Sequence, residues 1–328
     1  MSFELEQIIL VSVVYLLVLF LCAWATDRGM IPKRVVQHPA TYVLSLGVYA
    51  SSWAFYGSIG IAHDDGYVFL GFYFGLSGAF LLAPVLLVPI QKITSTYQLS
   101  SLADVLAFRF RSPMAGTLST LLLLFIALPL LALQIQAVSD SIHLLSDTSS
   151  PETLALGFCA LVTLFAMLFG TRHLAKRNQH DGLVVAIAFE SLLKLLIMML
   201  LGAVVIFQVF DGPAGLNAWL ESHQGVIIGM NSHLDDGPWR TTLLMYFASA
   251  VVMPHMFHMA FAENRHKRSL YTASWGLPFF LLLLSISTPL ILWAGLKMGS
   301  PMSPEFFPLA IGNALNNPWL TMIAYTGG

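Results

Sequence analysis

Apolar runs long enough to cross a lipid bilayer recur along this chain, and they constrain its fold more than any other feature. About 20 helical residues, each rising 1.5 Å, span the roughly 30 Å hydrocarbon core of a membrane. Hydrophobic residues make up 57% of the 328 residues and charged residues only 10%, which excludes an ordinary water-soluble domain. Because a segment in lipid must satisfy its own backbone polar groups, the sequence predicts an all-α, polytopic membrane protein.

Segment length predicts eight complete spans and the start of a ninth. The first span follows the acidic stretch MSFELEQ and not a basic n-region, so it is interpreted as a retained span and not as a signal peptide. The predicted spans cover residues 8–26, 42–62, 68–90, 116–142, 153–170, 183–210, 241–262 and 273–296, and the ninth begins near Trp319.

Lysine and arginine gather in every second loop between these spans. By the positive-inside rule, the basic loops face the cytoplasm and the N-terminus lies outside. The intervening loops are mainly acidic, with Arg240 and Lys297 as their basic residues. The basic loops carry Arg28, Lys33, Arg34, Lys92, Arg109, Arg111, Arg172, Lys176, Arg177, Arg265, Lys267 and Arg268.

The second span, YVLSLGVYASSWAFYGSIGI at 42–61, is rich in small and hydroxyl residues. Gly57-Ser58-Ile59-Gly60 is a poor helix interior, because each glycine costs roughly 1 kcal/mol relative to alanine. An interruption near Ser51 and Ser52 would free backbone carbonyls beside serine hydroxyls, and these oxygens suit a hard cation. Two interpretations stay open: a broken helix at a binding site, or a tightly packed interior helix without one.

Two further segments have recognisable roles. TSTYQLSSLADVLAFRFRSP has helical spacing, with a serine cap, Asp104 in the first turn and Pro113 as a stop; it is an interfacial helix or an ordinary connector. The fourth span carries Pro129, followed by Gln134 and other polar residues. A proline in a membrane helix is tolerated where protein or a cavity surrounds it, so this span is expected to line an interior.

Charged side chains inside the sixth span are the clearest candidates for function. Glu190 and Lys194 are four residues apart on one helical face. They are interpreted either as a structural ion pair or as a pair that takes part in ion coupling. His255 and His258 have a spacing that zinc ligands can have, but no third ligand is recognisable in the sequence. No nucleotide-binding or hydrolase motif is present, so the chain itself is not expected to be an enzyme.

Five stretches together resemble the sodium:solute symporter family, and most closely the transporter-like membrane domain of bacterial sensor histidine kinases. The symporters have Thr-Asp where this chain has Phe189-Glu190, which argues against ordinary sodium coupling. The stretches are SLGVYASSWAFYGSIG at 45–60, TSTYQLSSLADVLAFRF after the third span, ALQIQAVS at 132–139, GLVVAIAFESLLKL at 182–195 and MPHMFHMAFAEN at 253–264.

The resemblance implies a LeuT-like inverted-repeat transporter fold across residues 1–328. Residues 8–26 would be an extra N-terminal helix, 42–210 the first five-helix repeat and 241–328 a partial second repeat, so the chain looks C-terminally truncated. The first helix of each repeat is broken around solute and sodium in this fold. By resemblance, Ser51 faces the sodium ion, while Ser52, Trp53 and Tyr56, together with Gln134, lie near the solute.

The function implied is a multi-pass domain of the bacterial inner membrane that binds a small polar solute, such as an amino acid, and transports or senses it. It would act as the input module of a two-component sensor histidine kinase whose kinase region, with its response regulator, lies beyond this chain. A stand-alone sodium-coupled symporter and a non-transporting structural domain are the alternatives. Sodium is the one ion implied, and no other cofactor or nucleic-acid partner is expected.

The loop charges predict the result of a labelling experiment. A membrane-impermeant thiol reagent applied from outside should label Ser232→Cys and leave Arg177→Cys unlabelled, because loop 211–240 is expected outside and loop 171–182 in the cytoplasm. Labelling of Arg177→Cys alone would contradict the predicted orientation.

Overall fold

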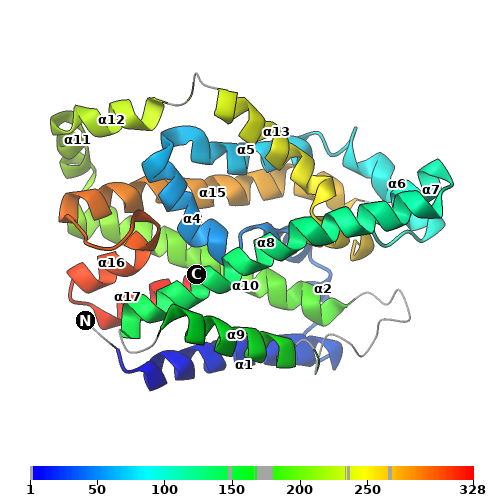
Figure 1. The fold of residues 1–328 in the computed structure, drawn as a ribbon, viewed down its shortest axis with the longest axis horizontal. Helices are drawn as coiled ribbons and strands as arrows, with labels where there is room; N and C mark the ends of the chain where they lie inside the picture. Colours follow the sequence, from blue (N-terminus) through cyan, green and yellow to red (C-terminus); the bar gives the residue numbers. More distant parts are fainter. Residues whose placement is uncertain are drawn as a thin grey trace.

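The structure is a computed structural model that describes residues 3–146, 150–165, 167, 180–232, 234, 237–264 and 268–328. Every regular element in these ranges is helical (Figure 1), which confirms the all-α prediction. The elements are α1 Leu5–Asp27, α2 Lys33–Val36, α3 Pro39–Ser45, η1 Leu46–Tyr49, α4 Ser52–Asp64, η2 Gly66–Phe69, α5 Leu70–Leu81, α6 Leu87–Tyr97, α7 Leu102–Phe110, α8 Pro113–Ser146, α9 Pro151–Phe165, α10 Asp181–Val204, η4 Val205–Val209, α11 Pro213–Ser222, α12 Gln224–Asn231, α13 Gly237–Val252, α14 Pro254–Phe257, η5 His258–Ala262, α15 Ser269–Met298, η6 Pro304–Phe306, α16 Phe307–Ala314 and α17 Pro318–Gly327.

Four helices in the described part are long and apolar enough to cross a membrane, so the protein is a multi-pass membrane protein. They are α1, α8, α10 with η4, and α15. A fifth candidate is the pair Gly237–Val252 and Pro254–Ala262, which is bent by 51°. Pro254 begins the second half of this pair, as expected where proline interrupts a membrane helix.

The prediction of eight continuous spans is not confirmed. The segment 42–62 forms α3, η1 and α4 with a break between η1 and α4. Segment 68–90 stops at Leu81 and restarts at Leu87, with Pro84 in the intervening turn. Of segment 153–170, the described part ends with α9 at Phe165 and the single residue 167. Hydropathy detects apolar length, but it does not detect where the backbone leaves the helix.

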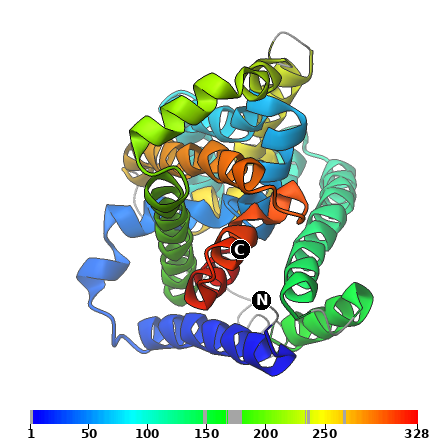
Figure 2. The ribbon, with the colours of Figure 1, turned by 90° about the vertical axis from the view of Figure 1, so that its left-hand side faces the viewer.

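Two long helices, α1 and α8, lie at the edge of the molecule (Figure 2), and many of their large apolar side chains are exposed. In the 18-residue apolar stretch that qualifies each helix as a membrane span, only 6% of residues are buried in α1 and in α8, against 61% in α15. The expectation that the fourth span lines an interior is therefore wrong for most of α8, although Ser139, Ile142 and Leu145 near its end are buried. Such exposed apolar faces are consistent with contact with a lipid bilayer.

The core is built around α15, which packs against α3, α4, α5 and α10. Figure 1 shows α15 running through the middle of the helix assembly, between α5 and α10. Tyr42 connects α3 to η5 because its hydroxyl donates to the Ala260 carbonyl at 3.1 Å and accepts from Asn264 at 3.0 Å. The broken segment 42–61 is therefore held against η5 by Tyr42 and packs against α15 through α3, η1 and α4.

The connector before α8 forms as predicted. Ser101 and Asp104 make a reciprocal capping box at the start of α7, and the helix ends at Phe110, before Pro113. Burial opposes ionisation of Asp104, but hydrogen bonds from Ser101 and Ser100 outweigh it and lower its pKa. Figure 1 shows α6 and α7 at one end of the molecule and α11 at the other. The loop that carries Arg177 lies outside the described residues.

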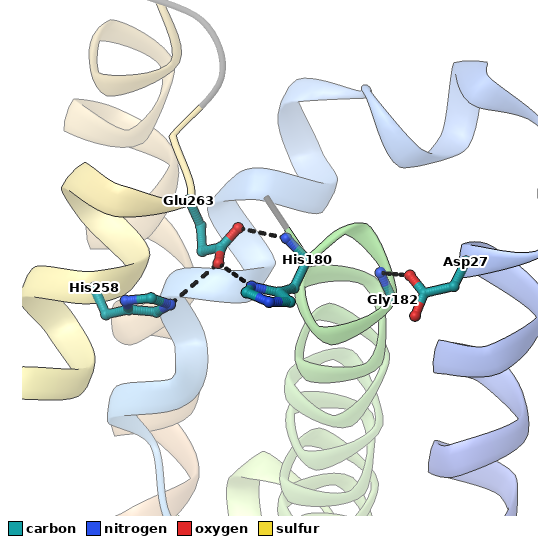
Figure 3. Close-up of polar contacts among 5 residues, drawn as sticks. All are labelled: Asp27, His180, Gly182, His258 and Glu263. Atoms are coloured by element: carbon teal, nitrogen blue, oxygen red, sulfur yellow. Dashed lines mark hydrogen bonds and ion pairs between the residues drawn. The ribbon is translucent and has the colours of Figure 1, made fainter. Parts of the chain in front are cut away.

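The start of α10 is anchored by two carboxylates from distant parts of the chain (Figure 3). Asp27, at the end of α1, accepts from the Gly182 amide at 2.9 Å, and Glu263, just after η5, accepts from the His180 amide at 2.9 Å. Both occupy the end of a helix where free N–H groups and the helix dipole favour negative charge. Burial opposes ionisation of Glu263, but hydrogen bonds from His258 and His180 outweigh it and hold its pKa at about 2.

The close contact of α1 with α10 predicts a sensitive glycine. A Cβ at Gly182 would lie 2.5 Å from the Ala23 carbonyl oxygen and 2.6 Å from Asp27 Oδ1, so Gly182→Ala should separate the two helices and destabilise the protein by about 1–3 kcal/mol. Thermal unfolding in detergent measures the change. The control is Gly157→Ala in α9, where nothing lies within 4 Å of the added Cβ; equal melting temperatures for the two variants would refute the packing argument.

Candidate functional site

The candidate site is the break between η1 and α4. Ser51 has an extended backbone (φ −73°, ψ 178°), and α4 begins at the next residue. The helix is therefore interrupted at Ala50–Ser51, beside the two serines where the sequence suggested a break, while the Gly57–Gly60 stretch stays helical. Gly57 is inside α4, where an added Cβ would lie 2.9 Å from Trp53 Nε1, so the glycine gives room to the indole. Tertiary packing here outweighs helix propensity.

Lys194 supplies the hydrogen bond that the first half of the broken helix lacks. Its Nζ donates to the Ala50 carbonyl at 2.7 Å and lies 3.2 Å from Glu190 Oε1. The Lys194 side chain is 5% exposed and that of Glu190 is 37% exposed. The predicted ion pair is therefore present, with its cation buried against the break and its anion partly exposed. A carbonyl freed inside a membrane protein costs several kcal/mol if it stays unpaired, and the ammonium satisfies it.

Close approach of two elements makes this contact possible. A Cβ at Gly47 in η1 would lie 2.5 Å from Ser191 Oγ in α10. A glycine and a serine therefore face each other one turn before Lys194, and small residues let helices in a membrane approach closely. The small residues of segment 42–61 therefore allow close packing, and the same segment also contains the break.

Gln134 supplies a hydrogen-bond acceptor to the first turn of α4, the second half of the broken helix. Its Oε1 accepts from the Trp53 amide at 3.0 Å, which is one of the free N–H groups in the first turn of α4. The other end of the same amide, Nε2, is buried and has no hydrogen-bond partner among the described residues. A buried unpaired donor is costly. Nε2 is one of five such atoms in the described part, with Tyr56 Oη, Ser58 Oγ, Thr288 Oγ1 and Trp293 Nε1, and it is the one whose side chain also bonds the first turn of α4.

The remaining predicted site residues divide into two groups. Ser51 is the N-cap residue of α4, but its side chain makes no capping hydrogen bond, and Ser52 follows it as a half-buried residue. Trp53 packs edge-on against Phe72, with ring centroids 5.9 Å apart. Tyr56 is only 2% exposed and packs against Phe306, so it belongs to the core between α4 and η6. The structure therefore brings Ser51, Trp53, Gln134 and Lys194 to the break and places Tyr56 in packing.

The cavity at the break is small. It has a volume of about 10 Å³ and is lined by Ala50, Lys194 and apolar side chains, which is room for about one water molecule. A solute needs several hundred Å³, so its binding requires movement of the side chains or helices around the break. The polar groups near the break are the N-terminus of α4, the Gln134 amide and the Lys194 ammonium, and of these only Lys194 lines the small cavity.

A second polar cluster was not recognised in the sequence. His258 was considered there together with His255, but in the structure its Nε2 lies 3.1 Å from Glu263 Oε1, and His180 Nδ1 lies 2.9 Å from the same oxygen (Figure 3). His180 is distant in the sequence, so no spacing rule connects it to His258. The one indication of this cluster within the local sequence is that His258 and Glu263 lie about one helical turn apart, at the end of η5.

Comparisons of the chain with protein-family models, with curated proteins and with solved structures find no match.

The two lysine-to-carbonyl hydrogen bonds in the described part give a matched test of the break. Lys194→Met should destabilise the protein by about 1–3 kcal/mol, because the buried Ala50 carbonyl loses its donor. Lys297→Met removes a 2.6 Å hydrogen bond to the Val209 carbonyl and a cation–π contact with Phe210 at 4.7 Å. The position is exposed, so water replaces the donor, and the loss should stay below about 1 kcal/mol. Thermal unfolding of both variants measures the difference, and equal losses of stability would contradict the role given to Lys194.

Proposed function

We propose that this chain is a solute-binding membrane domain of the sodium:solute symporter type, with its site at the break before α4. The observation that carries the proposal is the Gln134 side-chain amide, which caps the Trp53 N–H at 3.0 Å and keeps a buried, unpartnered Nε2 donor. A solute acceptor bound to Nε2 would remove the cost of leaving this buried donor unpaired.

The chemistry of the break favours a solute with a carboxylate or a similar acceptor. The N-terminus of α4, a helix of 13 residues, is the positive end of the helix dipole and attracts anions. Gln134 Nε2 adds a neutral donor, and the aromatic ring of Trp53 borders the same turn. A small amino acid presents a carboxylate for the donors and a side chain for the apolar wall.

The positions of the interruptions support the inverted-repeat fold. In the proposed mapping, α3, η1 and α4 form the first helix of the first repeat, and α13, α14 and η5 form the first helix of the second. Both are interrupted, at Ala50–Ser51 and at Met253–Pro254. In that fold the broken helices surround the solute near the bilayer midplane, so α4 would be the half-helix that points at it.

Lys194 takes the place of a coupling cation in this proposal. A sodium ion at the break would need the freed carbonyl oxygen and serine hydroxyls as ligands. The ammonium group already holds the Ala50 carbonyl at 2.7 Å, and a second cation beside it would be repelled. The domain therefore binds solute without sodium, as expected for the input module of a sensor histidine kinase and not for a sodium-coupled symporter.

A ligand screen tests the proposed site. The purified chain is heated in detergent with each of the standard amino acids, and at least one should raise its melting temperature, because a ligand that binds the folded state stabilises it. Gln134→Leu should abolish the shift. Gln136→Leu, an exposed glutamine on the same helix, is the control and should keep it. A ligand whose effect survives Gln134→Leu binds elsewhere and contradicts the proposal.

Sodium dependence is tested on the same ligand. Affinity measured in sodium chloride and in choline chloride should be equal, and Ser51→Ala should bind like Ser45→Ala, whose hydroxyl bonds the Tyr42 carbonyl within α3. Tighter binding in sodium that Ser51→Ala removes and Ser45→Ala keeps would instead establish Ser51 as a sodium ligand and favour the symporter. A structural domain would bind no amino acid in either salt.

A further inference from the structure

The cluster of His180, His258 and Glu263 has the composition and geometry of a metal site. One ligand atom from each residue lies within 4.8 Å of the other two, and the described residues contain no other such group. His180 immediately precedes α10, His258 begins η5, and Glu263 follows η5. Figure 3 shows both imidazole rings directed at one carboxylate oxygen. The start of α10 and the two ends of η5 therefore converge on a single point.

We propose that His180 Nδ1, His258 Nε2 and Glu263 Oε1 bind a divalent transition metal ion, with Zn²⁺ as the best fit. Two histidines and one glutamate are a recurrent zinc ligand set that leaves a fourth position for water. Imidazole nitrogen argues against Mg²⁺ and Ca²⁺, which prefer oxygen ligands.

The distances require little rearrangement. With metal–ligand bonds of about 2.0–2.1 Å, neighbouring ligand atoms of a tetrahedral site are about 3.3 Å apart. The two histidine nitrogens lie 2.9 Å and 3.1 Å from Glu263 Oε1, so these separations need to widen by only a few tenths of an ångström. The two nitrogens lie within 4.8 Å of each other and would take up the same tetrahedral spacing. Each neutral imidazole binds metal through an unprotonated nitrogen, and its one proton then sits on the other ring nitrogen.

The surroundings hold the carboxylate and leave the ion a route in. Glu263 Oε2 accepts from the His180 amide at 2.9 Å, which orients Oε1 toward the imidazoles, as outer hydrogen bonds do in metal sites. The Glu263 side chain is 3% exposed, while those of His180 and His258 are 41% and 43% exposed. Glu263 also lines a cavity of about 390 Å³. The histidines therefore give the ion and its water ligand access from solvent.

A bound ion would fasten the start of α10 to the end of η5. These elements belong to the two halves of the proposed inverted repeat, so the metal would restrain movement between the halves at the end of the molecule that also carries α6 and α7 (Figure 1). The inference does not depend on the proposed solute site.

The test uses the purified chain without a histidine tag, stripped with a chelator and kept reduced. Calorimetric titration should show one Zn²⁺ per chain, and Co²⁺ should give the visible absorption of a tetrahedral site with nitrogen and oxygen ligands. His180→Asn and His258→Gln place an amide nitrogen where the ligating imidazole nitrogen was, so they retain a donor to Glu263 and lose the metal ligand. Each should weaken Zn²⁺ binding about tenfold or more, since even outer-shell changes cost 10–100-fold.

The control is His255→Gln, three residues before His258 and outside the cluster, which should bind Zn²⁺ as the parent does. Glu263→Gln should also lose the metal; if it fails to fold because α10 loses its anchor, the two histidine variants decide. Circular dichroism confirms that each variant tested is folded. Zn²⁺ affinity and Co²⁺ absorption that are unchanged in His180→Asn and His258→Gln, or absent in the parent, would overturn the proposal.

Discussion

The hydrogen bond from Lys194 to the Ala50 carbonyl is the interaction on which the broken helix depends. A membrane helix that stops at Ala50 and restarts at Ser52 leaves a carbonyl unpaired where lipid and protein exclude water, and the ammonium at 2.7 Å satisfies it. The charge of Lys194 is in turn balanced by Glu190 at 3.2 Å. Burying this cation is costly, and a plain packed helix would not need it. The free-energy cost of burying Lys194 is consistent with a break that serves binding.

Helix α10 connects this interaction to the opposite polar cluster. Its first residues are held by Asp27 and Glu263, and Lys194 lies 12 residues after Gly182, which corresponds to about 18 Å along the helix. The two polar sites therefore lie on one continuous helix.

Small residues explain how so many polar contacts coexist with a membrane environment. Between helices in lipid, the hydrophobic effect gives little attraction, so close van der Waals packing and hydrogen bonds must hold the assembly together. Gly47 against Ser191 and Gly182 against Ala23 allow the backbones to approach, and the resulting proximity brings Lys194 and Asp27 within reach of their partners. The outward faces of α1 and α8 remain apolar because they have lipid as their solvent.

Composition and residue spacing were enough to predict the helical class, the membrane environment, the alternation of basic and acidic loops, the break near Ser51 and Ser52, the serine cap before α7, and the ion pair of Glu190 and Lys194. All of these depend on composition or on residues within one or two helical turns. The tertiary structure was needed to show that Gln134 and Lys194 bond the two sides of the break, that most of α8 faces outward, and that His180 joins His258 at Glu263. These features arise between helices far apart in the chain, and a local pattern carries no information about which backbone group a distant side chain will reach.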